Sequence, residues 1–454
     1  MVAAVTIARA ISGSRVKLKI HWWEAPLMAE SVVITGIGAV TPLGLDREST
    51  WASLVAGRSG AGPITAFDAS RLPTKIAAEV KGFDPATVLE GKRLRRSARF
   101  TQLAIAAARE AVADAGLAAT PDAGGAVPSA PHEIDSHLTL DPERTGVVIN
   151  AAVAGFDTIE AASLIMHERR LSPYFVASSL TNMPACEVAI DLGVHGPVTA
   201  SALACASGNY ALVEAARLIR SGEADVVVCG GTDAGVTESL LTGLSVMGAL
   251  SRRNDDPAAA SRPFDADRDG FLFGEGSVIM VLESRRHAER RNARVYAVMA
   301  GGALTSDAFH VSAPSPDGTH ATRAITRALS NAGVDPSEID YICAHGTSTK
   351  ANDRTETLAI RHAYGKSATK VAVSSPKSMA GHLIGAAGAL GAMAAVLAIR
   401  DGRVPPTINL TTPDPECDLD YVPNVAREMP VRAAAANAFG FGGQNCVAVF
   451  TKDE

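Results

Sequence analysis

Short apolar stretches alternate along the chain with longer stretches of helical character from residue 31 onward. Runs without a polar residue, such as VVVC at 226–229, are typical of strands buried on both faces of a sheet. The alternation of strand, loop and helix predicts an α/β architecture with helices covering the sheet on each side. In the first half, strands are predicted at 32–40, 146–153, 198–203 and 224–231, and helices at 100–115 and 209–220.

A charged helical segment at 284–293 (SRRHAERRNA) leads into a second half in which the same rhythm restarts. This second series comprises 295–308, 341–347, 371–378, a Gly/Ala-rich helix and a final strand at 446–452. The two halves are too dissimilar in sequence to prove a duplication. We therefore predict two similar halves, 28–285 and 286–454, preceded by an extension at 1–27.

The extension at 1–27 is basic, with Glu24 as its single acid. A transit peptide is one interpretation, although such peptides are usually richer in serine and arginine. An upstream start codon, with the true start at Met28, is the interpretation we prefer. The stretch 120–142 is rich in Ala, Gly, Pro, Asp and Ser without apolar periodicity, which indicates an exposed loop.

Composition narrows the possible functions. The 454 residues are 47% hydrophobic, enough to bury a large core, and the formal net charge of −6 gives no general affinity for nucleic acid or anionic membranes. The six cysteines contain no C-x-x-C pair, which argues against a disulfide framework or a zinc site and fits a reducing cytoplasm. The longest apolar stretch, 385–399, is too short to span a bilayer, so we expect a soluble protein without membrane association.

Cys205 lies where a predicted strand breaks into small residues before a helix (VTASALACASG, 198–208). A helix N-terminus favours a thiolate and an oxyanion, so a lowered thiol pKa is expected there. The alternative is a buried, inert thiol. Two histidines set among glycines and hydroxyl residues, His345 in AHGTST and His382 in KSMAGH, favour the nucleophile, and together these sites indicate covalent acyl chemistry.

Taken together, these motifs resemble the β-ketoacyl-acyl carrier protein synthases of the thiolase superfamily, especially the elongating type II enzymes, over nearly all of 31–452. Further matching stretches are ITGIGAVTPLG at 34–44, SRPFDADRDGFLFGEG at 261–276, VPPTINL at 404–410, CDLDYVP at 417–423 and FGFGGQN at 439–445. The resemblance implies a five-layered αβαβα fold and a decarboxylating Claisen condensation that elongates acyl chains by two carbons in fatty-acid biosynthesis.

The resemblance also implies roles for the site residues. Cys205 would carry the acyl group, while His345 and His382 would drive malonyl decarboxylation and stabilise the enolate. The backbone N–H groups of Cys205 and Phe441 would form a second oxyanion hole, with Phe441 gating the acyl pocket. The further residues expected in the site are Lys377, Glu356 and Asp353 as supporting groups, Thr347 and Thr349 on the pantetheine arm, and Phe439 and Val153 beside the substrate.

The partners implied are an acyl carrier protein, its acyl and malonyl thioesters, and a second copy of the chain in a homodimer. A run of basic residues that includes Lys92, Arg95 and Arg96 is either a solvated helix face or the docking site for the acidic carrier protein. No bound cofactor is expected, because the substrates arrive on phosphopantetheine, and no metal is expected either. Gly36 and Gly38 lack the third glycine of a dinucleotide fingerprint.

Two departures from the family pattern keep the pathway open: Ala206 and Gln444 stand where the family often has threonine. A polyketide ketosynthase of a specialised pathway is therefore the first alternative. A non-catalytic chain-length factor is a weaker one, because such partners lack the nucleophile. A thiolase would be expected to replace a site histidine with a second reactive cysteine, a position that neither Cys343 nor Cys446 occupies.

Overall fold

The computed structural model describes residues 30–118, 140–167 and 171–453. The extension at 1–27 and most of the predicted loop at 120–142 lie outside these residues. The strands are β1 (Val32–Val40), β2 (Gly62–Pro63), β3 (Ile76–Ala77), β4 (Thr145–Asn150), β5 (Val198–Thr199), β6 (Val226–Asp233), β7 (Gly276–Ser284), β8 (Ala297–Ser306), β9 (Tyr341–Cys343), β10 (Ala372–Ser374), β11 (Arg403–Val404), β12 (Arg427–Glu428), β13 (Ala433–Gly440) and β14 (Gln444–Thr451).

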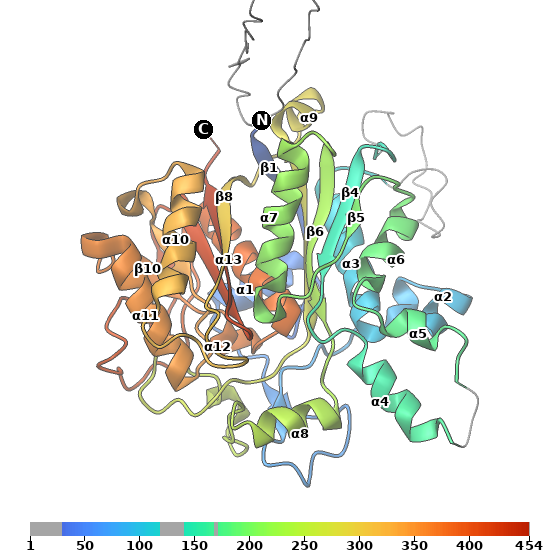
Figure 1. Cartoon of the computed structure of the whole chain (residues 1–454), viewed down its shortest axis with the longest axis horizontal. Helices are drawn as coiled ribbons and strands as arrows, with labels where there is room; N and C mark the ends of the chain where they lie inside the picture. The colour runs from blue at the N-terminus through green and yellow to red at the C-terminus, as the bar shows by residue number, and fades with distance from the viewer. Residues whose placement is uncertain (1–29, 119–139, 168–170, 454) are drawn as a thin grey trace, which may run out of the picture.

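The helices connect and cover these strands (Figure 1). They are α1 (Arg47–Val55), α2 (Gly91–Arg96), α3 (Arg99–Asp114), α4 (Phe156–Ile165), α5 (Phe175–Ser179), α6 (Met183–Leu192), α7 (Ser207–Arg220), α8 (Glu238–Val246), α9 (Arg285–Arg290), α10 (Thr319–Ala332), α11 (Lys350–Tyr364), α12 (Lys377–Ala380) and α13 (Ala387–Asp401).

Ten strands form one continuous sheet in the order β10-β9-β13-β14-β8-β1-β7-β6-β4-β5. The first five in this order come from the second half of the chain and the last five from the first half. The two sets meet only where β1 pairs with β8, through Val33 with Val298 and Ile34 with Ala297. The sheet therefore consists of two five-stranded parts joined by a short seam.

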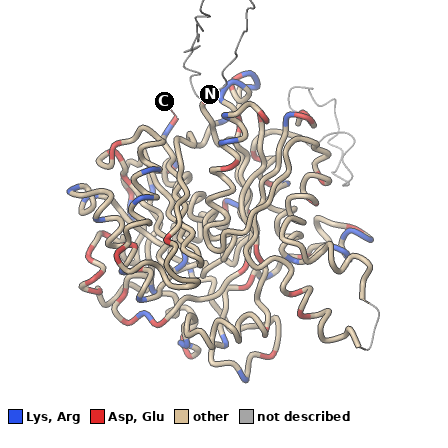
Figure 2. The backbone as a smooth tube through the Cα atoms, in the orientation of Figure 1, with Lys and Arg blue, Asp and Glu red and all other residues tan. Residues whose placement is uncertain are grey.

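The helices occupy three layers. α7 and α13 pack against each other and against strands of both parts, so they form the central layer. α3 and α6 cover the outer face of the first part, and α10 and α11 lie on the outer side of the second (Figure 1). This arrangement confirms the predicted five-layered α/β fold. Charged residues of both signs are interspersed over the outer helices and loops (Figure 2).

Helix α13 is almost completely enclosed: its residues Ala387–Ile399 are all buried, and only Arg400 and Asp401 at its end are exposed. The helical stretch Ile384–Asp401 is longer than the sequence analysis allowed, and by length and composition it could cross a membrane. Since 83% of it is buried inside the protein, it is a core helix. The central layer therefore accounts for this apolar stretch.

Small residues allow the central helices to approach closely. A Cβ added to Gly208 would lie 2.5 Å from the backbone nitrogen of Ala389, and one added to Gly388 would lie 2.6 Å from that of Asn209. The starts of α7 and α13 are therefore in backbone contact. This contact brings the segment before α7, which carries Cys205, beside the segment before α13, which carries His382.

Two predicted strands are shorter than expected. The strand predicted at 198–203 is regular only over Val198–Thr199, where both residues are exposed at the edge of the sheet. The strand predicted at 146–153 ends at Asn150, and residues 151–154 turn away from the sheet with Ala154 at a φ of +50°. In both places the apolar residues beyond the strand belong to loops that approach the candidate site.

Candidate active site

Cys205 lies in a short 3-10 turn, Ala204–Ala206, which runs directly into α7. Ala204 has a φ of +46°, a strained conformation for a residue with a side chain. The turn is held from behind by Asn150, whose side chain donates to the Ser207 carbonyl (2.9 Å) and accepts from the Ser201 N–H (2.7 Å). The thiol is thus fixed at the N-terminus of a helix, as the sequence predicted.

His345 follows β9 and is oriented through its backbone. Glu356 on α11 accepts the N–H groups of His345 (2.8 Å) and Gly346 (2.7 Å), one on each carboxylate oxygen. Asp353 accepts the N–H of Thr347 at 3.0 Å. The two acids that were expected to support the site therefore hold the AHGTST segment, and both are fully buried.

His382 follows α12, and its imidazole is oriented by the next turn of the chain. The Ile384 N–H donates to Nδ1 of His382 at 3.1 Å, so in the neutral ring the proton is on Nε2. Among the described residues this buried Nε2 has no hydrogen-bond partner. The side chain therefore presents a free N–H donor inside the protein.

Cys205, His345 and His382 converge although they come from three separate parts of the chain. One side-chain donor atom of each lies within 4.8 Å of the others, and all three residues are buried. The two imidazole rings are 5.5 Å apart at their centroids and nearly perpendicular, at 82°. The structure thus brings the three predicted residues together in one compact group.

The thiol pKa differs from the sequence-based expectation. Burial raises the pKa of Cys205 to about 11, although the charge of Lys377 and the backbone N–H groups of Phe441 and Cys205 act to lower it. The predicted lowered pKa is therefore wrong for this resting state, because desolvation outweighs the nearby positive groups.

Burial also governs the other titratable groups of the site. It lowers the pKa of His345 and His382 well below the usual value, and the charge of Lys377 lowers both further. Burial lowers the pKa of Lys377 as well, whereas the nearby Glu356 and Cys205 raise it. At neutral pH both histidines are therefore neutral rings, and each can donate one N–H inside the buried site.

The β13–β14 hairpin closes the site from the side of Cys205. Its turn carries Phe441, which is 39% exposed, and two glycines in the left-handed region, Gly442 (φ +78°) and Gly443 (φ +74°). A Cβ added to Gly440 would lie 2.6 Å from the Leu203 carbonyl oxygen and 3.1 Å from the Cys205 nitrogen. The absence of a side chain at Gly440 therefore lets the hairpin backbone reach the nucleophile.

The residues expected to contact substrate lie around this group. Thr347 and Thr349 hydrogen-bond each other through their hydroxyls at 2.9 Å, and Thr349 also caps α11. The ring of Phe439 is 5.9 Å from that of His345. Val153 belongs to an apolar cluster that includes Phe273 and Ile384, and so reaches the turn beside His382.

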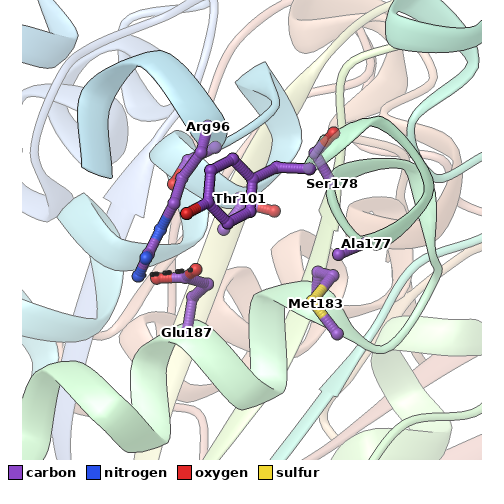
Figure 3. A pocket seen from close by; sticks show the side chains of 8 residues that line it. Arg96, Thr101, Ala177, Ser178, Met183 and Glu187 are labelled. Carbon is purple, nitrogen blue, oxygen red and sulfur yellow. Dashed lines mark ion pairs between the residues drawn. The ribbon is translucent and has the colours of Figure 1, made fainter. Parts of the chain in front are cut away.

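The three predicted docking residues on α2 divide into two kinds. Lys92 and Arg95 are exposed and have no ion-pair partner among the described residues. Arg96 points inward: it lies 3.5 Å from Glu187 and beside the ring of Tyr174, at a cavity of about 230 Å³ (Figure 3). Arg96 is therefore less free to bind a partner than its two neighbours.

Two site residues were missed by the sequence analysis, Asn150 and Asp233. Each is the last residue of a buried strand, β4 and β6, and these strands are parallel neighbours that end at the same edge of the sheet. A polar residue that ends an apolar strand was the available signal, because ligand sites in α/β sheets lie at the carboxyl ends of strands.

The comparisons with known proteins agree with this geometry. Models of the β-ketoacyl synthase N-terminal and C-terminal domains match residues 29–288 and 296–411. The chain is 44% identical to a 3-oxoacyl-[acyl-carrier-protein] synthase 2 of Synechocystis sp., over 94% of this chain and 99% of that protein. A protein of the same name from Coxiella burnetii is also 44% identical, over 93% and 98%.

Among solved structures, the ishigamide ketosynthase/chain length factor shares 37% identity at a TM-score of 0.84, covering 94% of this chain and all of that one. A type II polyketide ketosynthase, solved with its acyl-carrier protein and bound to a hexaketide, shares 32% identity at a TM-score of 0.82, with the same coverage. A β-ketoacyl synthase from Burkholderia phymatum shares 31% identity at 0.84, again with the same coverage.

Proposed function

The chain belongs to the β-ketoacyl synthase family, and from this premise we propose that it catalyses the decarboxylating condensation of fatty-acid elongation. An enzyme-bound acyl group is joined to malonyl-acyl carrier protein, giving 3-oxoacyl-acyl carrier protein and CO₂. The convergence of Cys205, His345 and His382 is the observation that carries this proposal. The substrates bring their own phosphopantetheine, so the reaction needs no resident cofactor.

In the first half-reaction, the sulfur of Cys205 attacks the carbonyl carbon of an acyl thioester on the carrier protein. A new C–S bond forms on Cys205, the bond to pantetheine breaks, and the proton of the cysteine leaves with the pantetheine thiol. The backbone N–H groups of Cys205 and Phe441, which already face the thiol, stabilise the tetrahedral oxyanion.

In the second half-reaction, malonyl-carrier binds with its thioester oxygen between His345 and His382. Loss of CO₂ leaves an enolate, whose charge the two neutral N–H donors stabilise. The enolate carbon attacks the Cys205 thioester, a C–C bond forms, the C–S bond to Cys205 breaks, and the cysteine leaves as a thiolate that takes up a proton from solvent. Neutral rings suit this step, since each keeps its proton as a hydrogen-bond donor and gives none away.

The test is a reconstituted reaction with acyl-carrier and malonyl-carrier substrates of several chain lengths. A product two carbons longer than the acyl substrate, formed together with one CO₂, supports elongation. Repeated extension without reduction of the keto groups would favour the polyketide alternative, which the two departures at Ala206 and Gln444 keep in view. No condensation with any carrier substrate would contradict both.

Recognition of the carrier protein is proposed for the exposed part of α2. Carrier proteins of this kind are acidic, and Lys92 and Arg95 present positive charge that no acid of this chain neutralises among the described residues. The complex of a related ketosynthase with its acyl-carrier protein supports a direct interaction. Electrostatic attraction at such a surface accelerates association and weakens at high salt.

A homodimer is proposed on the basis of the exposed apolar surface at the end of the sheet. β5 is the last strand in the order, so its outer edge pairs with no other described strand. The neighbouring helices α4, α5 and α6, on the same side of the molecule in Figure 1, expose large apolar side chains. These include Leu164 (75% exposed), Val176 (64%) and Ile190 (49%), alongside Val198 on β5 (37%). An apolar surface beside an open strand edge is typical of an association site.

A further inference from the structure

Asp233 is a buried carboxylate that has no cationic partner within the described part of the chain. It is the last residue of β6 and is 0% exposed. Its oxygens accept four backbone N–H groups: those of Ala152 (2.9 Å) and Gly385 (2.7 Å) on Oδ2, and those of Val153 and Ala154 (3.1 Å each) on Oδ1. A buried charge of this kind is tolerated only where such donors replace water.

The four donors come from two segments that are far apart in sequence. Residues 152–154 form the loop after β4 that carries Val153, the expected wall of the acyl pocket, and Ala154 within it has a φ of +50°. Gly385 follows Ile384, whose own N–H orients the imidazole of His382. The N–H of Ile384 thus donates to His382, and the next N–H along the chain, that of Gly385, donates to Asp233.

The fit at Gly385 is close on every side. A Cβ on Gly385 would lie 2.5 Å from Oδ2 of Asp233, and one on Gly231 would lie 2.3 Å from the Gly385 carbonyl oxygen. A Cβ on Gly208, near the start of α7, would lie 2.9 Å from the same oxygen. The turn beside His382 is thus pressed between the end of β6 and the helix that follows Cys205, with Asp233 supplying its polar contact.

We propose that Asp233 is a positioning residue that holds the acyl-pocket loop and the His382 turn at one fixed spacing around the nucleophile. The role proposed for these two segments in the reaction rests on the proposed function. The hydrogen bonds by which Asp233 holds both segments, here called the clamp, are a property of the fold. Burial raises the pKa of Asp233 to about 7 even though its N–H donors lower it, so the carboxylate is held mostly ionised above neutral pH.

The test compares Asp233→Asn, Asp233→Glu and a matched control, Glu283→Gln, in the full chain at pH 8. Asparagine has the same shape, but its NH₂ group would face two N–H donors. Glu283 is also a 0% exposed acid in a strand, but its partners are Arg291, His287 and Thr35, none of which lies in the candidate active site. Hydrogen–deuterium exchange read by mass spectrometry measures both segments without any substrate.

In Asp233→Asn, the exchange rate is expected to rise at least tenfold both in peptides covering 152–154 and in peptides covering 384–385. Asp233→Glu, which keeps both acceptor oxygens, should restore most of the protection, and Glu283→Gln should leave both segments unchanged. Unchanged exchange in Asp233→Asn, or a rise in one segment only, would overturn the clamp. If Asp233→Asn does not fold, Asp233→Glu is compared with the wild type instead. Exchange of both segments in Asp233→Glu as fast as in the unfolded chain would then overturn the clamp.

Activity then separates positioning from plain structural support. In Asp233→Asn, CO₂ release from malonyl-carrier should fall at least tenfold more than in Glu283→Gln, per folded molecule, with partial recovery in Asp233→Glu. An equal loss in the two amide variants would leave Asp233 only a structural role and overturn the proposal. An inactive wild type would contradict the proposed function alone, since the exchange result stands without it.

Discussion

At the scale of single residues, the site works by placing polar groups where water is excluded. His345 and His382 are neutral because they are buried beside Lys377, and their free N–H donors serve an oxyanion better than they would serve a cation. Sequence motifs pointed to the three residues that the structure brings together. They could not predict the high thiol pKa, because desolvation depends on neighbours that are distant in the chain.

The histidine environment predicts a pH dependence of stability. In the unfolded chain both imidazoles take up protons near pH 6.5, whereas in the folded protein their pKa is well below that value. The unfolded state therefore binds more protons as the pH falls below 6.5, and stability decreases by about 1.4 kcal/mol per pH unit for each histidine. Urea unfolding between pH 5 and 7 measures this slope.

The control is the double variant His345→Asn/His382→Asn, which removes both groups and leaves the other acids in place. Its free energy of unfolding should vary less steeply with pH over the same range than that of the wild type. Equal slopes in the two proteins would show that the buried histidines are protonated in the folded state, contrary to the neutral rings described above.

At the scale of elements, the central helices and the β13–β14 hairpin determine the site. The long apolar strands and the helices near 100–115 and 209–220 were predictable, since their periodicity is strong. The ends of α3 and α7 differ from the predicted ones by at most two residues. The ends of β4 and β5 were not, because the apolar residues beyond them serve loops that pack over the site. The hydrophobic pattern alone cannot separate an apolar residue in a strand from one in a loop that packs over the site.

Gly440 gives a prediction for the hairpin. In Gly440→Ala the new Cβ would displace the hairpin from the Cys205 backbone, so the Phe441 N–H would no longer face the oxyanion. Loss of one such donor costs about 10² to 10³ in kcat. Steady-state kinetics should show this loss. The control is Gly243→Ala in α8, where nothing lies within 4 Å of the added Cβ, and near-equal activity of the two variants would contradict the role of Gly440.

Helix α2 gives a prediction for carrier recognition. Lys92→Glu/Arg95→Glu should raise KM for carrier-linked substrates at least tenfold, with little change for small acyl thioesters that lack the carrier. The effect should diminish at high salt, as expected for exposed charges. The same reversal at Arg290, on α9 and away from α2, is the control. An equal effect on both substrate types would show that the variants act on folding or chemistry instead of docking.

At the scale of the whole molecule, the two halves supply different parts of one reaction. Cys205 comes from the first half, and both histidines and the Phe441 hairpin come from the second, so the seam between β1 and β8 and the packing of α7 on α13 keep the reacting groups together. The overall layering followed from the sequence through its resemblance to a family. The resemblance also implied that the three groups share one site, but their distances needed the structure, since no local pattern reports contacts between halves.

The open edge of β5 predicts the state of association. The wild type should elute and scatter light as a dimer at micromolar concentration, and Val198→Asp/Ile190→Asp, which places charges on the exposed apolar surface, should shift it toward monomer. Val425→Asp is the control, because Val425 is 75% exposed but lies in a distant loop. A monomeric wild type would contradict the homodimer.

The most direct test of the central claim is the intact mass of the protein after a single turnover with acyl-carrier substrate. We predict that the wild type gains the mass of one acyl group, which malonyl-carrier then removes as a product two carbons longer, while Cys205→Ala gains none. Acylation of Cys205→Ala, or no acylation of the wild type by any carrier substrate, would contradict Cys205 as the nucleophile of a condensing enzyme.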